Sequence, residues 1–544
     1  MRYLSENKRE DMRMKKRTAA RSMAALMGAA MVLTACGGGN TTAPTTGASS
    51  RGETQTASES AESGKITKTD IVVGQASDIV TLDPAGQQDT TSGVLMKHAY
   101  STLLDVDNEG KVVPDLAESY EMKSDTEYVF KLREDACFWD GTPVTAQDVK
   151  FSLDRAKGMP KTKSNTSKIE EVTVNGDHEV TIKLTEPYAA FKTIVTQHNL
   201  SILSEKAVTE AGDSYGDVDN LLGSGPFKVT EWVPNDHYTL VRNDNYWGEM
   251  PIATSITCRV IPEGSARTIA LEAGEIDVVW SVDPTDCANV ESNPDVKLLS
   301  QPSTGIDYVG MNTQKEKFSD KRVRQAINYA LDKQTFVDTI IEGRGLVANS
   351  YINAAIPGWT DEVEAYPYDP EKAKELLAEA GYPDGFECSI FVNGDLRTRS
   401  AQILQAQLAD VGIKVDISTY EWGALLDTLN AGEHEMFLLG WSNTSFDPDG
   451  STYQLFYSGN HGATGNRAFF SNDKVDELIL SAQRESEESK RMELYKELQF
   501  VLHEESPWCP LYYKENNVGV RADLKGFTLH AGAQHYLGNC HYEE

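Results

Sequence analysis

Strand-like and helix-like segments are mixed along almost the whole of residues 66–530, and this mixture restricts the fold more than any other feature. The stretches EYVFKLRED and HEVTIKLTE alternate apolar and polar residues between turn residues, as half-buried strands do. A helical stripe follows further along, formed by Val323, Ala326, Ile327, Ala330 and Leu331. Strands and helices that are mixed in this way predict an α/β fold built in layers.

Two further helices are marked by their ends. Thr145 and Asp148 have the spacing of a capping box, in which each side chain satisfies the other residue's backbone N–H. Another helix has Asp369 as its N-cap, Pro370 at its first position and Gly381 just past its end. No internal repeat interrupts this pattern.

The N-terminus reads as a targeting segment. Several basic residues precede an apolar run from Met23 to Leu33, which is too short to span a bilayer and fits a signal peptide. The run ends in Leu33-Thr34-Ala35-Cys36, which resembles the bacterial lipobox, whose cysteine becomes the lipidated N-terminus. We therefore predict a signal peptide over 1–35, a lipid on Cys36 and attachment to the outer, extracytoplasmic face of the cell membrane.

A tether is predicted over 36–65. Residues 37–64 contain no Val, Ile, Leu, Phe, Tyr or Trp, so they cannot bury enough apolar surface to fold. No second apolar span follows, so the lipid is the only membrane anchor that the sequence predicts.

Charge and cysteine content narrow the functional classes. The formal net charge is −32, and removal of 1–35, with eight basic and three acidic residues, leaves −37. Such a chain lacks the basic surface that nucleic acid or anionic lipid requires. Six cysteines follow Cys36 without a C-x-x-C pair, so neither a zinc site nor a redox motif is indicated. The sequence does not decide whether these six cysteines are free thiols or form one or two disulfides.

An enzyme is disfavoured by the motifs that are missing. The sequence holds no G-x-S-x-G, H-E-x-x-H, Walker loop or G-x-G-x-x-G, so no nucleophile elbow, zinc protease site or phosphate cradle is indicated. No catalytic residue and no cofactor are predicted.

Several segments, taken together and in order, resemble one family, the solute-binding proteins of ABC importers, family 5, which bind dipeptides, oligopeptides or nickel. The stretches include FWDGTPVTAQDVKFSLDR, GSGPFKVTEW and ALEAGEIDVVW, and they lie at 113–155, 223–248, 270–280, 308–333 and 368–382. The resemblance implies the two-lobe periplasmic-binding-protein fold (class II, cluster C type), a ligand enclosed between the lobes, and ABC permease subunits as partners of a monomer.

The resemblance also implies a domain layout. The first lobe would comprise 66–105, 215–312 and 505–544, the second lobe 313–504, and an extra domain, 106–214, would be inserted in the first lobe. Closure of the two lobes around the ligand would be the capture step.

Candidate ligand-binding residues follow from the same resemblance. In the family, a strand that ends in Gly-Trp pairs its main chain with the bound peptide, here at Gly440, Trp441 and Ser442, although Trp441 could also simply pack beneath the site. Peptide-binding members hold the α-ammonium with a carboxylate three residues after the tryptophan. This chain has Thr444 there, and we expect Asp447 or Asp449 to substitute, or a ligand without that ammonium.

Other candidates lie elsewhere in the chain. The first lobe would contribute Gln88 and Thr90, while Arg397 or Arg399 would take an anionic end of the ligand and Trp422 would form a wall. An oligosaccharide, nickel or a metal chelate stays open as the cargo, and a hydrolase or a sensor is the less favoured class. The tail with His530, His535, Cys540 and His541 is expected to be frayed rather than a metal site.

Overall fold

The computed structural model describes residues 65–544. The predicted signal peptide, Cys36 and all but the last residue of the predicted tether lie outside the described residues. Within that range, no helix has both the length and the apolar character needed to cross a membrane.

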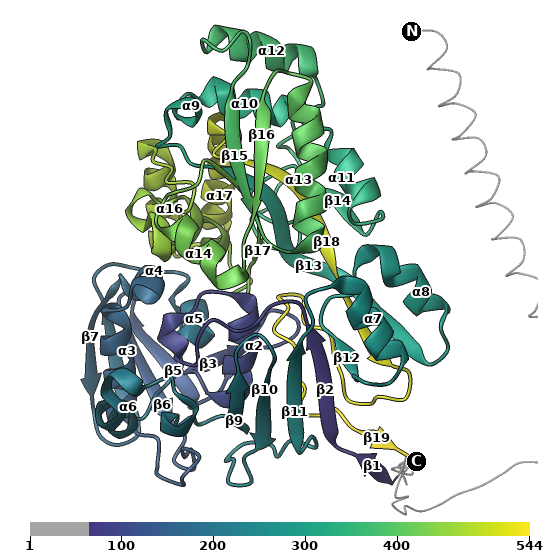
Figure 1. The fold of residues 1–544 in the computed structure, drawn as a ribbon. Coiled ribbons are helices and arrows are strands. Elements are labelled where there is room, and N and C mark those ends of the chain that lie inside the picture. The colour runs from purple at the N-terminus through teal and green to yellow at the C-terminus, as the bar shows by residue number, and fades with distance from the viewer. Residues whose placement is uncertain (1–64) are drawn as a thin grey trace, which may run out of the picture. The chain divides into compact units, whose positions relative to one another are not determined.

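One large mixed sheet runs through most of the described chain (Figure 1). Its strand order is β16-β15-β17-β13-β18-β12-β2-β11-β10-β9, and β14 pairs with β18 off this path. The strands are β2 (Asp70–Gln75), β9 (Phe227–Val233), β10 (His237–Arg242), β11 (Ser255–Val260), β12 (Val278–Val279), β13 (Val296–Met311), β14 (Gly345–Val347), β15 (Glu387–Val392), β16 (Lys414–Thr419), β17 (Met436–Ser442) and β18 (Trp508–Arg521).

The antiparallel strands β13 and β18 join the two halves of this sheet. Their pairing runs from Val296 opposite Arg521 to Gly310 opposite Trp508, with an irregularity between Pro302 and Ile306. On one side of the irregularity β18 also pairs with β12, and on the other side β13 also pairs with β17. We call the half with β2 and β9–β12 the first lobe and the half with β14–β17 the second lobe.

Helices cover both faces of the second lobe. Alternate residues of β13 and β17 face opposite ways, so Val309 and Leu438 join one core while Tyr308 and Leu439 join another. The helices are α9 (Glu316–Ser319), α10 (Lys321–Ala330), α11 (Lys333–Thr339), α12 (Pro370–Glu379), α13 (Gly394–Ala409), α14 (Trp422–Asn430), α15 (Asp449–Phe456), α16 (Asp473–Arg484) and α17 (Glu488–Glu505). This arrangement confirms the predicted α/β layers.

The first lobe carries fewer helices, namely α2 (Thr90–Ala99), α7 (Gly264–Glu272) and α8 (Cys287–Ser292). Beside it, a separate antiparallel sheet of order β5-β6-β8-β7 has its own core. Its elements are β5 (Ala117–Ser124), β6 (Glu127–Leu132), β7 (Ile169–Val174), β8 (Glu179–Leu184), α3 (Ala146–Lys157), α4 (Lys163–Thr166), α5 (Phe191–Ile194) and α6 (Glu205–Ala211). We call this unit the inserted domain. Two small ribbons pair β3 (Leu104–Val106) with β4 (Val112–Pro114), and β1 (Ile66–Lys68) with β19 (Tyr542–Glu543).

The local predictions are confirmed at several elements. Both alternating stretches form strands, β6 and β8, and the backbone N–H of Thr145 donates to Oδ2 of Asp148 at 2.9 Å, as a capping box requires. Gly381 follows α12 with φ of +93°, a conformation that favours glycine. The predicted helical stripe is buried, but the helix stops at Ala330 and α11 begins separately at Lys333.

The C-terminal tail is not frayed, and the sequence-based expectation was wrong there. His530, His535 and Cys540 are buried, and the backbone N–H of Leu537 donates to Nε2 of His98 in α2 at 3.0 Å. Burial lowers the pKa of His535 to about 3, so its imidazole is neutral at physiological pH. The described residues contain no group of three or more His, Cys, Asp or Glu side chains placed to hold a metal. All six described cysteines are free thiols.

Candidate functional site

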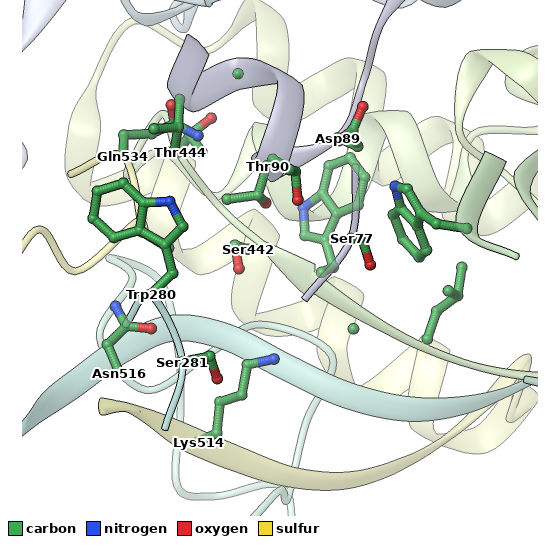
Figure 2. A pocket seen from close by; sticks show the side chains of 18 of the residues that line it. Ser77, Asp89, Thr90, Trp280, Ser281, Ser442, Thr444, Lys514, Asn516 and Gln534 are labelled. Carbon is green, nitrogen blue, oxygen red and sulfur yellow. The ribbon is translucent and has the colours of Figure 1, made fainter. Parts of the chain in front are cut away.

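A cavity of about 400 Å³ lies between the lobes and the inserted domain (Figure 2). The start of α2 with the residues before it, the segment after β12, the middle of β18 and the C-terminal tail line one side. The end of β17, the start of α14 and the loop that precedes α16 line the other. The volume falls in the range of small-ligand sites.

Amide side chains make up much of the polar lining, and three tryptophans contribute apolar surface. Trp280, Trp422 and Trp441 provide flat apolar surfaces at three places in the wall. Ten amide side chains, each with donors and an acceptor, belong to Gln87, Gln88, Asn165, Gln197, Asn199, Asn393, Gln454, Asn516, Asn517 and Gln534. Such a lining can hydrogen-bond a ligand that is rich in both donors and acceptors.

The end of β17 reaches the cavity, as its Gly-Trp pattern predicted. Gly440, Trp441, Ser442 and Thr444 all line it. The indole Nε1 of Trp441 donates to the backbone carbonyl of Gly450 at 2.9 Å, so the ring is anchored as well as facing the cavity. Trp441 therefore both packs and lines the site.

Thr444 is already engaged with the inserted domain. Its Oγ1 donates to Oε1 of Gln197 at 2.8 Å. This hydrogen bond connects the loop after β17 to the inserted domain. Thr444 is uncharged, so it does not supply the negative charge of a carboxylate. Its hydroxyl proton is already donated to Gln197.

Asp447 and Asp449 do not line the cavity. Asp447 forms an ion pair with Arg491 of α17, and Asp449 accepts hydrogen bonds from Tyr188 at 2.6 Å and Gln483 at 2.9 Å. Both carboxylates are buried in a network that joins the second lobe to the inserted domain. Their geometry does not favour the ligand contact expected from the sequence.

We expect the free energy of unfolding to depend on pH because the Asp449 carboxyl is buried. Burial and the nearby Asp447 carboxylate raise the pKa of Asp449 from 3.8 to about 6. The folded protein therefore binds this proton more tightly than the unfolded chain, and the associated stability is lost as pH rises from about 4 through 6. Relative to Asp449→Asn, the wild type should lose about 2–3 kcal/mol between pH 4 and pH 7.5. Urea denaturation of both proteins across this range tests it, and parallel pH profiles would contradict it.

Gln88 and Thr90 both line the cavity from the first lobe, as predicted. The amide Nε2 of Gln88 also reaches across to the second lobe, where it donates to the Thr464 carbonyl at 3.3 Å and to Oε1 of Gln454 at 3.4 Å. Gln88 therefore contributes to closure as well as to the wall.

The structure separates the two predicted arginines. Arg397 lines the cavity, with its guanidinium 5.9 Å from the ring centre of Trp422, which lines it too. Arg399 does not line it, because its Nη2 forms a 2.6 Å ion pair with Asp283 of the first lobe. The geometry favours Arg399 as a link between the lobes.

Trp280 and Lys514 line the cavity, and the sequence analysis missed both of them. Trp280 stacks on His535 with ring centres 5.1 Å apart, and Lys514 reaches the buried Asp307 at 2.8 Å. Arg397 lies 3.9 Å from the same carboxylate. Trp280 had a usable signal, since it comes directly after the residues DVV, much as Trp441 comes after the apolar run FLLG. A charge pair between β13 and β18 carries no such signal.

Asp89 and Arg467 also lie in the wall. Oδ1 of Asp89 caps α2 by accepting from the Ser92 N–H at 2.9 Å, while its Oδ2 is buried with no hydrogen-bond donor among residues 65–544. Burial raises the pKa of Asp89 and lowers that of Arg467. The charged forms of Asp89 and Arg467 are therefore less stable in this wall than they would be in water.

These features define a two-lobe binding protein with a ligand cavity between its lobes. A sequence model of the bacterial extracellular solute-binding proteins, family 5 (Middle), matches residues 111–463. The chain belongs to this family, whose members bind solutes outside the cytoplasm for transport and are not enzymes.

Individual relatives agree over nearly the whole length. The glutathione-binding protein GsiB of Shigella boydii is 32% identical over 479 residues, covering 85% of this chain and 92% of GsiB. The structure of DppA from Helicobacter pylori in complex with the peptide STSA has a TM-score of 0.84 at 28% identity, covering 88% and 99% of the two chains. AppA of Bacillus subtilis in complex with a nonapeptide has a TM-score of 0.81 at 26% identity, covering 89% and 100%.

Proposed function

We propose that this protein captures short peptides outside the cytoplasm and delivers them to the permease of an ABC importer. The observation that carries this proposal is the cavity between the lobes, lined by ten amide side chains beside the end of β17. A peptide presents one donor and one acceptor per residue, which such a lining satisfies. The ligands named for GsiB, DppA and AppA, which are glutathione and peptides, support the same class.

In this proposal the main chain of Gly440 and Ser442 pairs with the peptide backbone, in the manner of an added strand. Gln88 and Thr90 contact the peptide from the first lobe, and Arg397 and Trp422 from the second. Closure would be stabilised by the Arg399–Asp283 pair and by the Gln88 bonds, which join the lobes. Asp447 and Asp449 are structural.

The anchoring and the domain boundaries complete the proposal. Lipidation of Cys36 would hold a monomer at the membrane through the tether, and the domain ranges inferred from the resemblance would apply. Loss of membrane association in Cys36→Ser, with ligand binding retained, would support the anchor. An equal distribution of both proteins between membrane and soluble fractions would oppose it.

The cargo can be tested by native mass spectrometry of residues 65–544, which contain all the cores described above. Mild denaturation should release masses of short peptides. A hexose ladder or a metal ion would contradict the peptide proposal and leave the fold intact. If the protein is empty, thermal shifts with dipeptides, longer peptides, oligosaccharides and nickel decide, because a ligand at 100 times its Kd adds about 2.7 kcal/mol of stability.

A further inference from the structure

The cavity is more basic than the protein around it. Its lining holds four basic side chains, Arg344, Arg397, Arg467 and Lys514, and only two acidic ones, Asp89 and Glu515. The lining histidines His198 and His535 are neutral, since burial lowers the pKa of each to about 3. The whole chain has a net charge of −32, so an excess of positive charge in its cavity needs a physical explanation.

Three of the four cations already have carboxylate partners. Arg344 pairs with Glu291 at 2.7 Å, Lys514 with Asp307 at 2.8 Å, and Arg397 lies 3.9 Å from Asp307. These carboxylates partly offset the three positive charges within the protein.

Arg467 has no such partner. It is 6% exposed, its Nε donates to Oδ1 of Asn430 at 3.0 Å, and no carboxylate oxygen of residues 65–544 lies within ion-pair distance of it. The two terminal nitrogens have no acceptor in the same described range, and the residue lines the cavity. Burial lowers the pKa of Arg467, and the nearby Asp89 carboxylate opposes this shift without forming an ion pair with the guanidinium.

The backbone around Arg467 is fixed. Its carbonyl is bonded to Nε2 of His434 at 2.8 Å, and Asn430, which orients the guanidinium, ends α14. A guanidinium that is held in place, largely buried and left without an anion is costly unless an anion arrives from outside. Its two free nitrogens match the two oxygens of a carboxylate.

We propose that Arg467 is the anion-binding residue of the cavity and that the peptide bound there presents a carboxylate to it. This inference rests on the proposed peptide function and names the ligand more narrowly as an acid-bearing peptide. The carboxylate would belong to an acidic side chain or to the peptide C-terminus, and both offer the same two oxygens.

The test uses pairs of short peptides that differ only in charge, measured by calorimetry on residues 65–544. One arm compares glutamate with glutamine at the same position, and the other compares a free C-terminus with its amide. The wild type should prefer the acid in one arm by about tenfold or more. In Arg467→Gln, that preference should fall to within about threefold, and the arm in which it falls identifies the carboxylate.

Two more variants separate the role of Arg467 from effects on folding. Asn430→Asp places a carboxylate beside Nε of Arg467 and should reduce the acid preference with the arginine still present. Arg259→Gln removes one positive charge from a partly exposed side chain of β11, where Arg259 lies 3.8 Å from Glu275, and should leave the preference unchanged. Melting curves show that each variant is folded.

The contrary outcomes are distinct. Equal affinity for acid and amide in the wild type, or a preference that survives both Arg467→Gln and Asn430→Asp, overturns the role of Arg467 and leaves the peptide function standing. If no peptide binds, the peptide function fails, and glutarate then tests Arg467 alone. Thermal stabilisation by glutarate that is lost in Arg467→Gln supports the anion site, and no stabilisation of the wild type overturns it.

Discussion

Replacing Arg491 with methionine is expected to lower the free energy of unfolding by about 3–5 kcal/mol, because it leaves buried carboxylates without their cation. Arg491 is 3% exposed and pairs with Asp447, while Asp449, 1% exposed, lies in the same network. Burial by itself would lower the pKa of Arg491, but Tyr495 and the carboxylates of Asp447 and Asp449 outweigh it and raise that pKa, so the charge is firmly held. Methionine fills a similar volume and removes the charge together with the hydrogen bonds that Arg491 donates to Asp447 and Tyr495.

The double variant Arg491→Met/Asp447→Asn is the matched control, since it removes both members of the ion pair. It should recover at least half of the lost stability, as measured by urea denaturation at pH 7.5. A loss below about 1 kcal/mol for Arg491→Met alone would show that the network is solvated and contributes as a surface pair does.

Gly440→Val is expected to weaken peptide binding by more than about a hundredfold, through a steric change at the end of β17. A Cβ at Gly440 would lie 3.1 Å from both carboxylate oxygens of Asp307, which leaves no room for two further methyl groups. Asp307 would have to move, and its 2.8 Å pair with Lys514 would open at the cavity wall. The strand end that we propose pairs its main chain with the ligand would shift with it.

Gly423→Val is the control for this substitution, because a Cβ at Gly423 in α14 meets nothing within 4 Å. It should leave affinity within about threefold, whereas Gly440→Ala, with one added carbon, should fall between the two valine variants. Calorimetric titration with the peptide identified by mass spectrometry measures all three. Retained affinity in folded Gly440→Val would show that the ligand does not depend on this strand end.

The sequence predicted local structure correctly wherever the pattern that defines a helix or strand lay within one continuous segment. The capping box at Thr145, the Asp369-Pro370 helix start and the alternating strands β6 and β8 depend on neighbours in the chain, and all are confirmed. The break between α10 and α11 was missed because the apolar stripe continues through Leu331, which is buried like its neighbours. The buried tail was missed because its partner, His98, lies more than 400 residues earlier.

The sequence by itself determined the α/β class, the family and the end of β17 as a wall of the cavity, because each depends on patterns that are continuous or ordered along the chain. Only the tertiary structure decided that Asp447 and Arg399 are paired with other residues and that Thr444 is bonded to Gln197. It also decided that Arg467 has no carboxylate partner among residues 65–544. Whether a charged side chain faces a ligand or a partner depends on which distant residue folding brings within about 4 Å, and sequence spacing does not encode that distance.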